Sequence, residues 1–367
     1  MNSGYIIIAS AGLTVAFVSW VLVGLLIRLA PRIGLLDRPN ERSLHTRATP
    51  RGGGLGFVLA VALALGVFLG LTGLPSSGDG MGAELRHPVM IYLGAALFIA
   101  IVSLRDDFKS LSPGIRFLCQ LAVAGAAIWG VGYFGQLSIP GCGAVDLGWA
   151  GAGLTVIWIV GLTNVYNFMD GIDGIAGIQG LTAGLAWAAA GIWLGSPAIG
   201  LLGLLFAGGS LGFLIYNWSP AKVFMGDVGS AFLGYSFAVL PLLLVRDGPP
   251  AGRPFDAGAV PVFALLVVWP FVADGFYTFL RRSARGEAVW KAHRSHLYQR
   301  LVQTGWTHAR VSTLYGVWCA VSGAAGLFWL SGASGAAVVA WVVPLASLAG
   351  IFLLVRHREH NVGKNHG

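Results

Sequence analysis

Residues 164–177 read NVYNFMDGIDGIAG, and they lie between two apolar runs at 147–161 and 178–194. Together with their neighbours, both runs are long enough to cross a lipid bilayer as helices. The polar segment is therefore expected at the edge of the bilayer. An ionised side chain beside hydrocarbon costs about 2.5–3.5 kcal/mol, so carboxylates in such a place usually have a function. A helix cap followed by a turn is the alternative, although one aspartate would be enough for it.

Four polar side chains of this segment follow one another at every third position: Asn164, Asn167, Asp170 and Asp173. On an α-helix this row drifts around the axis by about 60° per step, whereas a 3₁₀ turn stacks it. Glycines after both aspartates favour a tight turn and allow a ligand to approach the backbone. We predict that the two carboxylates take part in catalysis and that the two carboxamides bind substrate.

The composition is that of an integral membrane protein. Of the 367 residues, 56% are hydrophobic and only 10% are charged, and the mean hydropathy is +0.75. A soluble domain has about 25% charged residues. The net charge of +8 does not indicate a nucleic-acid partner, because the basic residues lie in segments between apolar runs. The three cysteines are scattered and form no disulfide or metal-binding pattern.

The apolar runs predict an all-α polytopic fold with about eleven transmembrane helices. Their expected positions are about 4–30, 52–74, 88–104, 113–133, 149–167, 175–194, 197–217, 229–246, 258–280, 308–331 and 334–355. Residues 138–149, between two of these spans, contain Pro140, Gly141 and Gly143 and are expected to form a short hairpin.

The basic residues predict the orientation. With the N-terminus outside, only Arg86, Arg246 and Arg253 of the 23 Lys and Arg residues fall on the outer side. This asymmetry follows the positive-inside rule and puts the C-terminus in the cytoplasm. We expect a single transmembrane domain over residues 1–367, with its functional loops on the cytoplasmic face. These loops are 31–52, 105–113, 167–175, 217–229 and 281–308.

The first of these loops is basic and leads into a glycine-rich helix start, DRPNERSLHTRATPRGGG at 37–54. Basic side chains beside a helix N-terminus suit a phosphate, so His45 and Arg51 are predicted to bind substrate. Attraction to anionic lipids is an alternative explanation of the arginines. The glycines match no P-loop.

The second loop begins with two adjacent carboxylates, Asp106 and Asp107, followed by Lys109. Aspartate is unfavourable at the C-terminal end of a helix, so an ordinary helix end does not explain the pair. Such a pair can supply a general base beside a cation site. We predict catalytic roles for both aspartates and substrate binding for Lys109.

The last two loops add further polar groups. In NWSPAKVFMGDVGS at 217–230, Lys222 precedes Asp227, and glycines flank the aspartate at a helix start. Hard oxygen ligands of this kind, completed by waters and substrate phosphates, suit Mg²⁺. In KAHRSHLYQR at 291–300, Arg294 lies between His293 and His296. Zinc would need further ligands that are not spaced for it, so these side chains, with Lys222, are predicted to contact a phosphate or a uracil edge.

The five loops together bring carboxylates, lysines, arginines and histidines to one membrane face. Transfer of a phosphoryl group between two anions needs a metal ion to screen charge, cations to hold the leaving phosphate, and a base. A transporter also uses intramembrane carboxylates, but it fits less well because these charges cluster on one face and no internal repeat is visible.

Three of the segments resemble motifs of the polyprenyl-phosphate N-acetylhexosamine-1-phosphate transferase family. Residues 106–109 (DDFK) resemble its DDxxK, residues 164–174 its NxxNxxDGxDG, and residues 224–230 (FMGDVGS) its FMGDxGS. The sequence departs from the family at 293–296, where HRSH stands in place of HIHH or HHH. The whole arrangement is most similar to the branch that starts O-antigen chains, with UDP-N-acetylfucosamine or UDP-N-acetylquinovosamine among its donors.

The resemblance implies a reaction in the bacterial inner membrane. Undecaprenyl phosphate attacks the β-phosphorus of a UDP-N-acetyl sugar, and UMP is released. Mg²⁺, or alternatively Mn²⁺, is expected to be held by Asp227 with Asp107 and Asp173. The other expected partners are membrane lipids and a second copy of the chain in a homodimer.

The resemblance also implies roles for single residues. Asp106 is the candidate base for the lipid phosphate. Asp170 and its neighbour Asp173 would orient the metal, a lysine or the nucleotide. His293 and His296 would hold the diphosphate or the sugar of the donor.

Overall fold

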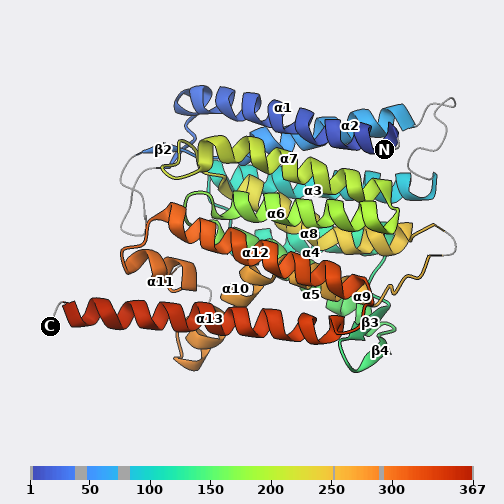
Figure 1. Ribbon diagram of the computed structural model, residues 1–367. Coiled ribbons are helices and arrows are strands. Elements are labelled where there is room, and N and C mark those ends of the chain that lie inside the picture. Colours follow the sequence, from blue (N-terminus) through green and yellow to red (C-terminus); the bar gives the residue numbers. More distant parts are fainter. Residues whose placement is uncertain (1–2, 38–47, 73–82, 251–252, 289–292, 366–367) are drawn as a thin grey trace.

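The computed structural model describes residues 3–37, 48–72, 83–250, 253–288 and 293–365, and it is mostly helical (Figure 1). Its helices are α1 (Ser3–Ile33), α2 (Gly54–Thr72), α3 (Ala83–Phe108), α4 (Pro113–Gly130), α5 (Ala150–Met169), α6 (Ile175–Leu194), α7 (Pro197–Asn217), α8 (Gly226–Asp247), α9 (Ala259–Val267), α10 (Trp269–Ala284), α11 (Leu297–Gln303), α12 (His308–Leu330) and α13 (Ala336–Asn365). Two antiparallel hairpins pair β1 (Leu36–Asp37) with β2 (Thr49–Pro50), and β3 (Gln136–Ile139) with β4 (Gly143–Asp146). The second is the hairpin expected from the turn residues.

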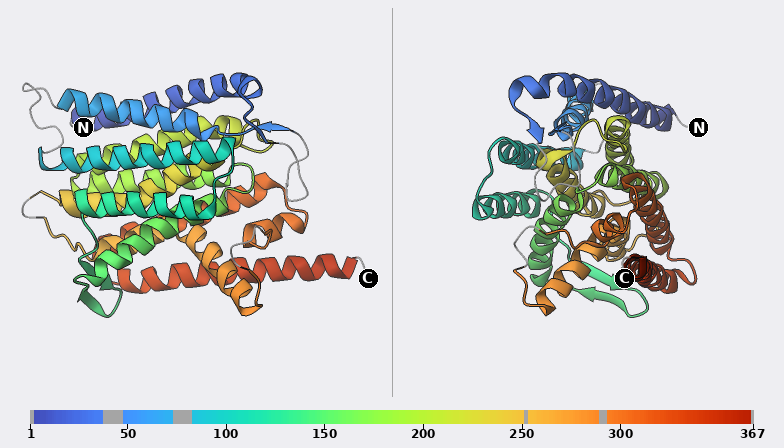
Figure 2. Two further views of the ribbon diagram at one scale, coloured as in Figure 1. Left: turned by 180° about the vertical axis from the view of Figure 1, so that it is seen from behind. Right: turned by 90° about the vertical axis from the view of Figure 1, so that its left-hand side faces the viewer.

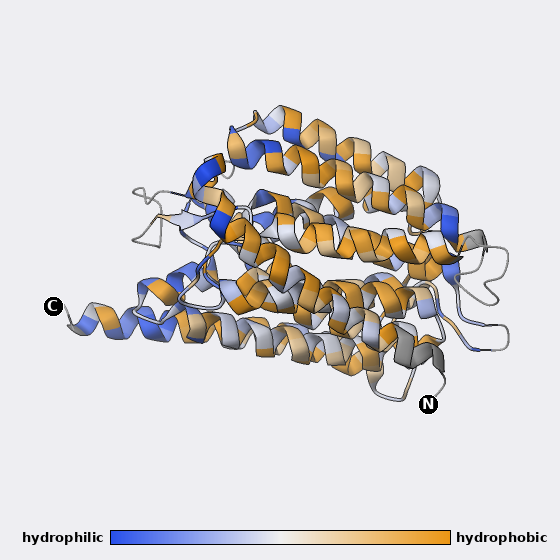
Figure 3. Cartoon of the chain, turned by 90° about the horizontal axis from the view of Figure 1, so that it is seen from above, coloured by the Kyte–Doolittle hydropathy of each residue, from blue (hydrophilic) through white to orange (hydrophobic). Residues whose placement is uncertain are grey.

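Within the described ranges, ten helices are long and apolar enough to cross a membrane, and the bent pair α9–α10 would make eleven. The long helices run side by side (Figure 2). Hydrophobic residues lie along their lengths, and hydrophilic residues gather toward their ends (Figure 3). The all-α polytopic fold is thus confirmed. The two termini lie at opposite ends of the bundle (Figure 1). Which end faces the cytoplasm stays a prediction.

Helix α8 is the most buried of the long helices. In its membrane-spanning stretch 94% of the residues are buried, compared with 28% in α1 and 22% in α13. Helices α3 and α5 pack against it. Because α8 carries Asp227 in its first turn, the burial of this helix places that carboxylate among the ends of its neighbours.

The span expected at 258–280 is broken rather than straight. The axes of α9 and α10 differ by 80° across the break. Pro270, in the first turn of α10, has no N–H with which to continue the helical hydrogen bonds. The carbonyl of Val267 instead accepts a hydrogen bond from the side-chain amide of Gln179, 3.0 Å away. The bend gives α10 a direction of its own beside α5.

Candidate active site

Two segments that lie far apart in the chain meet where α2 and α8 begin. The Gly53 N–H donates to the carbonyl of Phe224 at 2.8 Å. A Cβ on Gly54 would collide with the backbone of Gly229, so glycine is needed for the two helix starts to touch. The glycine-rich loop therefore serves this packing, and it sets Arg51 beside the first turn of α8.

Arg51 joins two of the predicted catalytic carboxylates. Its Nε lies 2.8 Å from Asp107 Oδ1, and its Nη2 lies 3.0 Å from Asp227 Oδ1. Burial of the guanidinium acts to lower the pKa of Arg51. The negative charges of Asp107 and Asp227 outweigh this effect, so the pKa of Arg51 is raised. The arginine therefore stays charged and holds both carboxylates in one place.

Asp107 also caps α8. Its side chain is fully buried, and its two oxygens accept the backbone N–H groups of Asp227 and Val228, each at 3.0 Å. A carboxylate at this position is stabilised by the free N–H groups and the positive end of the helix dipole. The approach requires a glycine at 226, because Gly226 has a φ of +75° and a Cβ there would lie 2.8 Å from Asp107 Oδ2.

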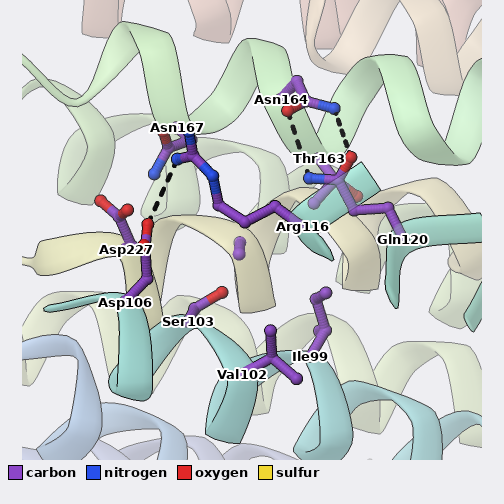
Figure 4. Close-up of a pocket in the computed structure, with 11 residues that line it drawn as sticks. Ile99, Val102, Ser103, Asp106, Arg116, Gln120, Thr163, Asn164, Asn167 and Asp227 are labelled. Carbon is purple, nitrogen blue, oxygen red and sulfur yellow. Dashed lines mark hydrogen bonds and ion pairs between the residues drawn. The ribbon is translucent and has the colours of Figure 1, made fainter. Parts of the chain in front are cut away.

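The carboxyl group of Asp106 lies next to that of Asp227 (Figure 4), and the two repel each other when both are ionised. Asp106 is held by the Leu111 N–H and by Nη1 of Arg116, the latter at 3.2 Å. Both aspartates line a cavity of about 30 Å³, which has room for a water molecule or a small ion. A cation placed between two such carboxylates would be strongly stabilised.

The two predicted carboxamides come from the last turns of α5. Asn167 Nδ2 donates to Ser230 Oγ of α8 at 3.0 Å. The carboxamide of Asn164 exchanges two hydrogen bonds with that of Gln120, at 2.7 and 3.2 Å (Figure 4). Both asparagines line the small cavity, so they lie where the prediction requires, although their amides already have protein partners.

The two aspartates of the turn after α5 have different surroundings. Burial of Asp170, followed by the negative charge of Asp227, raises the pKa of the Asp170 carboxyl well above its ordinary value. Asp173 Oδ2 accepts the Ala221 N–H at 3.1 Å, and its Oδ1 lies 3.2 Å from Nδ1 of His308. Burial acts to raise the pKa of Asp173, but these hydrogen bonds outweigh it and lower the pKa. The sequence does not predict His308, because no motif surrounds it.

A larger cavity, of about 450 Å³, forms a groove between α5 and α10. Its walls are mostly apolar and include Phe168 and Phe276, while His293 and His296 line its polar end. Asn164 lines both this groove and the small cavity of Asp106 and Asp227. The groove therefore meets the carboxylate cluster at that asparagine.

The loop that carries His293 and His296 is held against α10. The ring centroids of His293 and His296 are 4.9 Å apart. Nδ1 of His296 lies 3.3 Å from the buried carboxylate of Asp274, a residue of α10. The backbone carbonyl of Arg294 accepts a hydrogen bond from Nε2 of Gln303.

The remaining predicted residues contribute less to this geometry. Lys109 and Lys222 are exposed, and no ion pair in the described part of the chain involves either side chain. His45 lies outside the described residues. The structure thus gathers Arg51, Asp106, Asp107 and Asp227 most closely, with the turn of Asp170 alongside.

The carboxylates offer the hard oxygen ligands that Mg²⁺ prefers. Of the three predicted metal ligands, Asp227 is 22% exposed and lines the small cavity, whereas Asp107 is fully buried beneath Arg51. Asp173 is hydrogen-bonded elsewhere, and no three His, Cys, Asp or Glu residues in the described ranges form a ready metal cluster. The arrangement fits a cation held by Asp227 and Asp106, with waters and substrate phosphates as further ligands.

Comparison with known proteins agrees with the motifs. Residues 89–245 match the model of glycosyl transferase family 4. The chain is 34% identical over 308 residues to the probable undecaprenyl-phosphate N-acetylglucosaminyl 1-phosphate transferase of Bacillus subtilis, covering 82% of this chain and 80% of that protein. It is 31% identical over 379 residues to the decaprenyl-phosphate N-acetylglucosaminephosphotransferase of Mycobacterium tuberculosis, covering 96% and 90%.

A more distant relative has a related activity. The chain is 27% identical over 330 residues to the phospho-N-acetylmuramoyl-pentapeptide-transferase of Staphylococcus aureus, covering 85% of this chain and 95% of that protein. These similarities cover between 82% and 96% of the chain. Together with the ten helices of the described ranges that are long and apolar enough to cross a membrane, they identify a multi-pass protein of the bacterial inner membrane. The chain therefore belongs to glycosyl transferase family 4, among its polyprenyl-phosphate hexosamine-1-phosphate transferases.

Proposed function

We propose that this protein transfers an N-acetylhexosamine 1-phosphate from a UDP-N-acetyl sugar to undecaprenyl phosphate and releases UMP. The observation that carries the proposal is the meeting, at Asn164, of an apolar groove with a cluster of carboxylates. An apolar groove at the side of a membrane bundle suits a polyprenyl chain. The charged cluster at its end suits the phosphate at the head of that lipid.

The proposed step is a single displacement. An oxygen of the lipid phosphate forms a bond to the β-phosphorus of the donor, while the bond from this phosphorus to the oxygen that bridges it to the α-phosphorus breaks. UMP leaves with the electrons of that bond. Lipid phosphates are largely ionised near neutral pH, so Asp106 is needed only for the fraction that still carries a proton. This favours direct transfer over a covalent aspartyl intermediate.

Mg²⁺, or alternatively Mn²⁺, would be held by Asp227 and Asp106. Asp107 and Asp173, the other two ligands that the sequence predicts, would support the site from a distance, because Asp107 caps α8 and Asp173 is bonded to Ala221 and His308. When bound, the ion screens the charge of the two anionic substrates. Arg51 keeps Asp107 and Asp227 together. Asp170, whose carboxyl interacts with the charge of Asp227, and His308, whose Nδ1 lies 3.2 Å from Asp173, would orient the nucleotide.

The donor sugar is proposed from the relatives. Two of them are named for N-acetylglucosamine transfer and one for phospho-N-acetylmuramoyl-pentapeptide transfer, so an N-acetylhexosamine is the shared chemistry. The product would start a lipid-linked cell-surface polysaccharide such as an O-antigen. The HRSH segment favours a sugar that differs from those of relatives with HIHH or HHH.

The test is direct. Purified protein in detergent is incubated with undecaprenyl phosphate, Mg²⁺ and a panel of UDP-N-acetyl sugars, and the lipid products are weighed by mass spectrometry. We expect one sugar to give a lipid heavier by its sugar 1-phosphate, together with an equal amount of UMP. If every donor of the panel remains intact while the protein is folded and binds the lipid, the proposed reaction is wrong.

A further inference from the structure

Asp274 is a buried carboxylate that the proposed reaction does not use. It lies in α10 with no exposed surface. Its oxygens accept the backbone N–H groups of Leu297 (2.8 Å) and Tyr298 (3.1 Å) at the start of α11, and the hydroxyl of Tyr315 at 2.7 Å. With these donors the ionised carboxylate is well stabilised without a metal.

The same carboxylate fixes the proton of one histidine. Nδ1 of His296 lies 3.3 Å from Asp274 Oδ1. An ionised carboxylate only accepts hydrogen bonds, so Nδ1 carries the proton. Since the His296 ring is nearly buried and lines the groove, Nε2 is the ring nitrogen left to face a substrate.

His293 has the opposite arrangement. The backbone N–H of Ser295 points at Nδ1 of His293 from 3.3 Å, and the Ser295 hydroxyl lies 2.9 Å from the same nitrogen. A backbone N–H only donates, so Nδ1 is the unprotonated nitrogen and the ring proton is on Nε2. Burial, followed by the neighbouring His296 and Arg282, lowers the pKa of His293 to about 4, which keeps this ring neutral.

We propose that Asp274 and Ser295 are positioning residues that hold His296 and His293 in opposite tautomers at the polar end of the groove. His293 then presents an Nε2–H group as a hydrogen-bond donor. His296 presents an unprotonated Nε2 as an acceptor, because its ring proton is held on Nδ1 by Asp274. The two histidines are therefore not interchangeable. The catalytic consequence rests on the proposed function, because it assumes that a substrate reaches this end of the groove.

Ser295 stands in the HRSH segment, which departs from the HIHH or HHH motif of the family. A third histidine would stand near this position in an HIHH or HHH segment. The short serine side chain instead turns back onto His293. Ser295 thereby fixes the orientation of the His293 ring.

The first experiment reads the tautomers directly and does not depend on any substrate. The full chain is labelled with ¹⁵N-histidine in detergent micelles, and ring nitrogen shifts are recorded, with His293→Gln and His296→Gln assigning two of the eight histidines. We expect a protonated Nε2 for His293 and a protonated Nδ1 for His296. The same tautomer in both rings, or averaged signals for either ring, would overturn the proposal even if the enzyme transfers sugar phosphates as proposed.

The second experiment measures UMP release. The amide nitrogen of glutamine lies near the place of histidine Nε2, and that of asparagine near the place of Nδ1. We therefore expect His293→Gln to keep more of kcat/KM than His293→Asn. Asp274→Asn should lower kcat/KM by about tenfold to a hundredfold, taking as a guide the range found for residues that orient metal-bound imidazoles.

A double-mutant cycle separates positioning from stability. If Asp274 acts through His296, the loss in Asp274→Asn/His296→Gln is much smaller than the product of the single losses. Asp247→Asn is the matched control: it removes a half-buried carboxylate that accepts a hydrogen bond from Ser196 at the other end of α8. This variant should leave the tautomers unchanged. Multiplicative losses would contradict the positioning role.

Discussion

The carboxylate of Asp107 accepts a hydrogen bond from the backbone N–H of Asp227 at 3.0 Å. The end of α3 thus caps the start of α8, although 120 positions separate the two residues in the chain. The interaction gives the adjacent aspartates of the DDFK segment different tasks. Asp107 holds the helix that carries Asp227, and Asp106 shares the small cavity with the Asp227 side chain.

Replacement of Asp227 by Asn should remove most of the turnover without unfolding the protein. The variant keeps the shape of the side chain but removes a charge that faces the proposed cation, so we expect UMP release to fall by at least about 100-fold. UMP release and the thermal midpoint Tm are measured together. Asp247→Asn serves as the control, and turnover close to that of the wild type in Asp227→Asn would exclude the metal assignment.

Gly226→Ala should disturb the site through Asp107. Alanine at a φ of +75° costs about 1–2 kcal/mol, and its Cβ would lie 2.8 Å from Asp107 Oδ2. We expect a lower Tm and a loss of UMP release greater than the loss of folded protein. Gly66→Ala in α2 is the matched control, since a Cβ there meets nothing within 4 Å. Equal behaviour of the two variants would show that the approach of Asp107 to α8 does not matter.

The raised pKa of Asp170 predicts how stability depends on pH. Between the unfolded value of about 3.9 and the raised value in the fold, the folded protein binds a proton that the unfolded chain has released. The contribution of Asp170 to the free energy of unfolding is therefore lost as the pH rises through that interval. In the presence of a chelator, the Tm of the wild type should fall relative to that of Asp170→Asn as the pH rises above about 4, the ordinary pKa of an aspartate.

The comparison with Asp170→Asn cancels the other titrating groups. Asp173, whose pKa is lowered, contributes the opposite slope in the acid range, but it does so in both proteins. A difference in Tm that stays constant with pH would mean that the pKa of Asp170 is not raised in the folded protein. Loss of activity in the more stable Asp170→Asn variant would show that the carboxyl group of Asp170 is kept for function.

The sequence predicts the charged cluster better than the contacts within it. Asp106, Asp170 and Asp227 come together because each lies where an apolar run ends or begins, and the lengths of the runs bring these points to one end of the bundle. The cap between Asp107 and α8 depends on the pairing of Gly53 with Phe224. This contact joins distant segments and has no local signal.

The bend at α9–α10 and the role of Asp274 are likewise absent from local patterns. Pro270 marks the break, but it lies within an apolar run whose length is that of an ordinary span. Asp274 is recognisable as unusual because it lies inside that run. Its partners, the start of α11 and Tyr315, are set by tertiary packing, as is the contact of His308 with Asp173.

The groove can be tested apart from the carboxylates by filling it. Gly161 lines the groove on α5, and a Cβ there meets nothing within 4 Å, so Gly161→Leu should fold normally while its side chain occupies space proposed for the polyprenyl chain. We expect a higher KM for undecaprenyl phosphate, by about tenfold if one or two buried methylene contacts of the lipid are lost, and an unchanged KM for the UDP-sugar. Gly153→Leu, an exposed position of the same helix that does not line the groove, is the matched control. If both variants bind the lipid as the wild type does, the polyprenyl chain does not occupy this groove. The contact between the groove and the carboxylate cluster at Asn164 would then not support the proposed reaction.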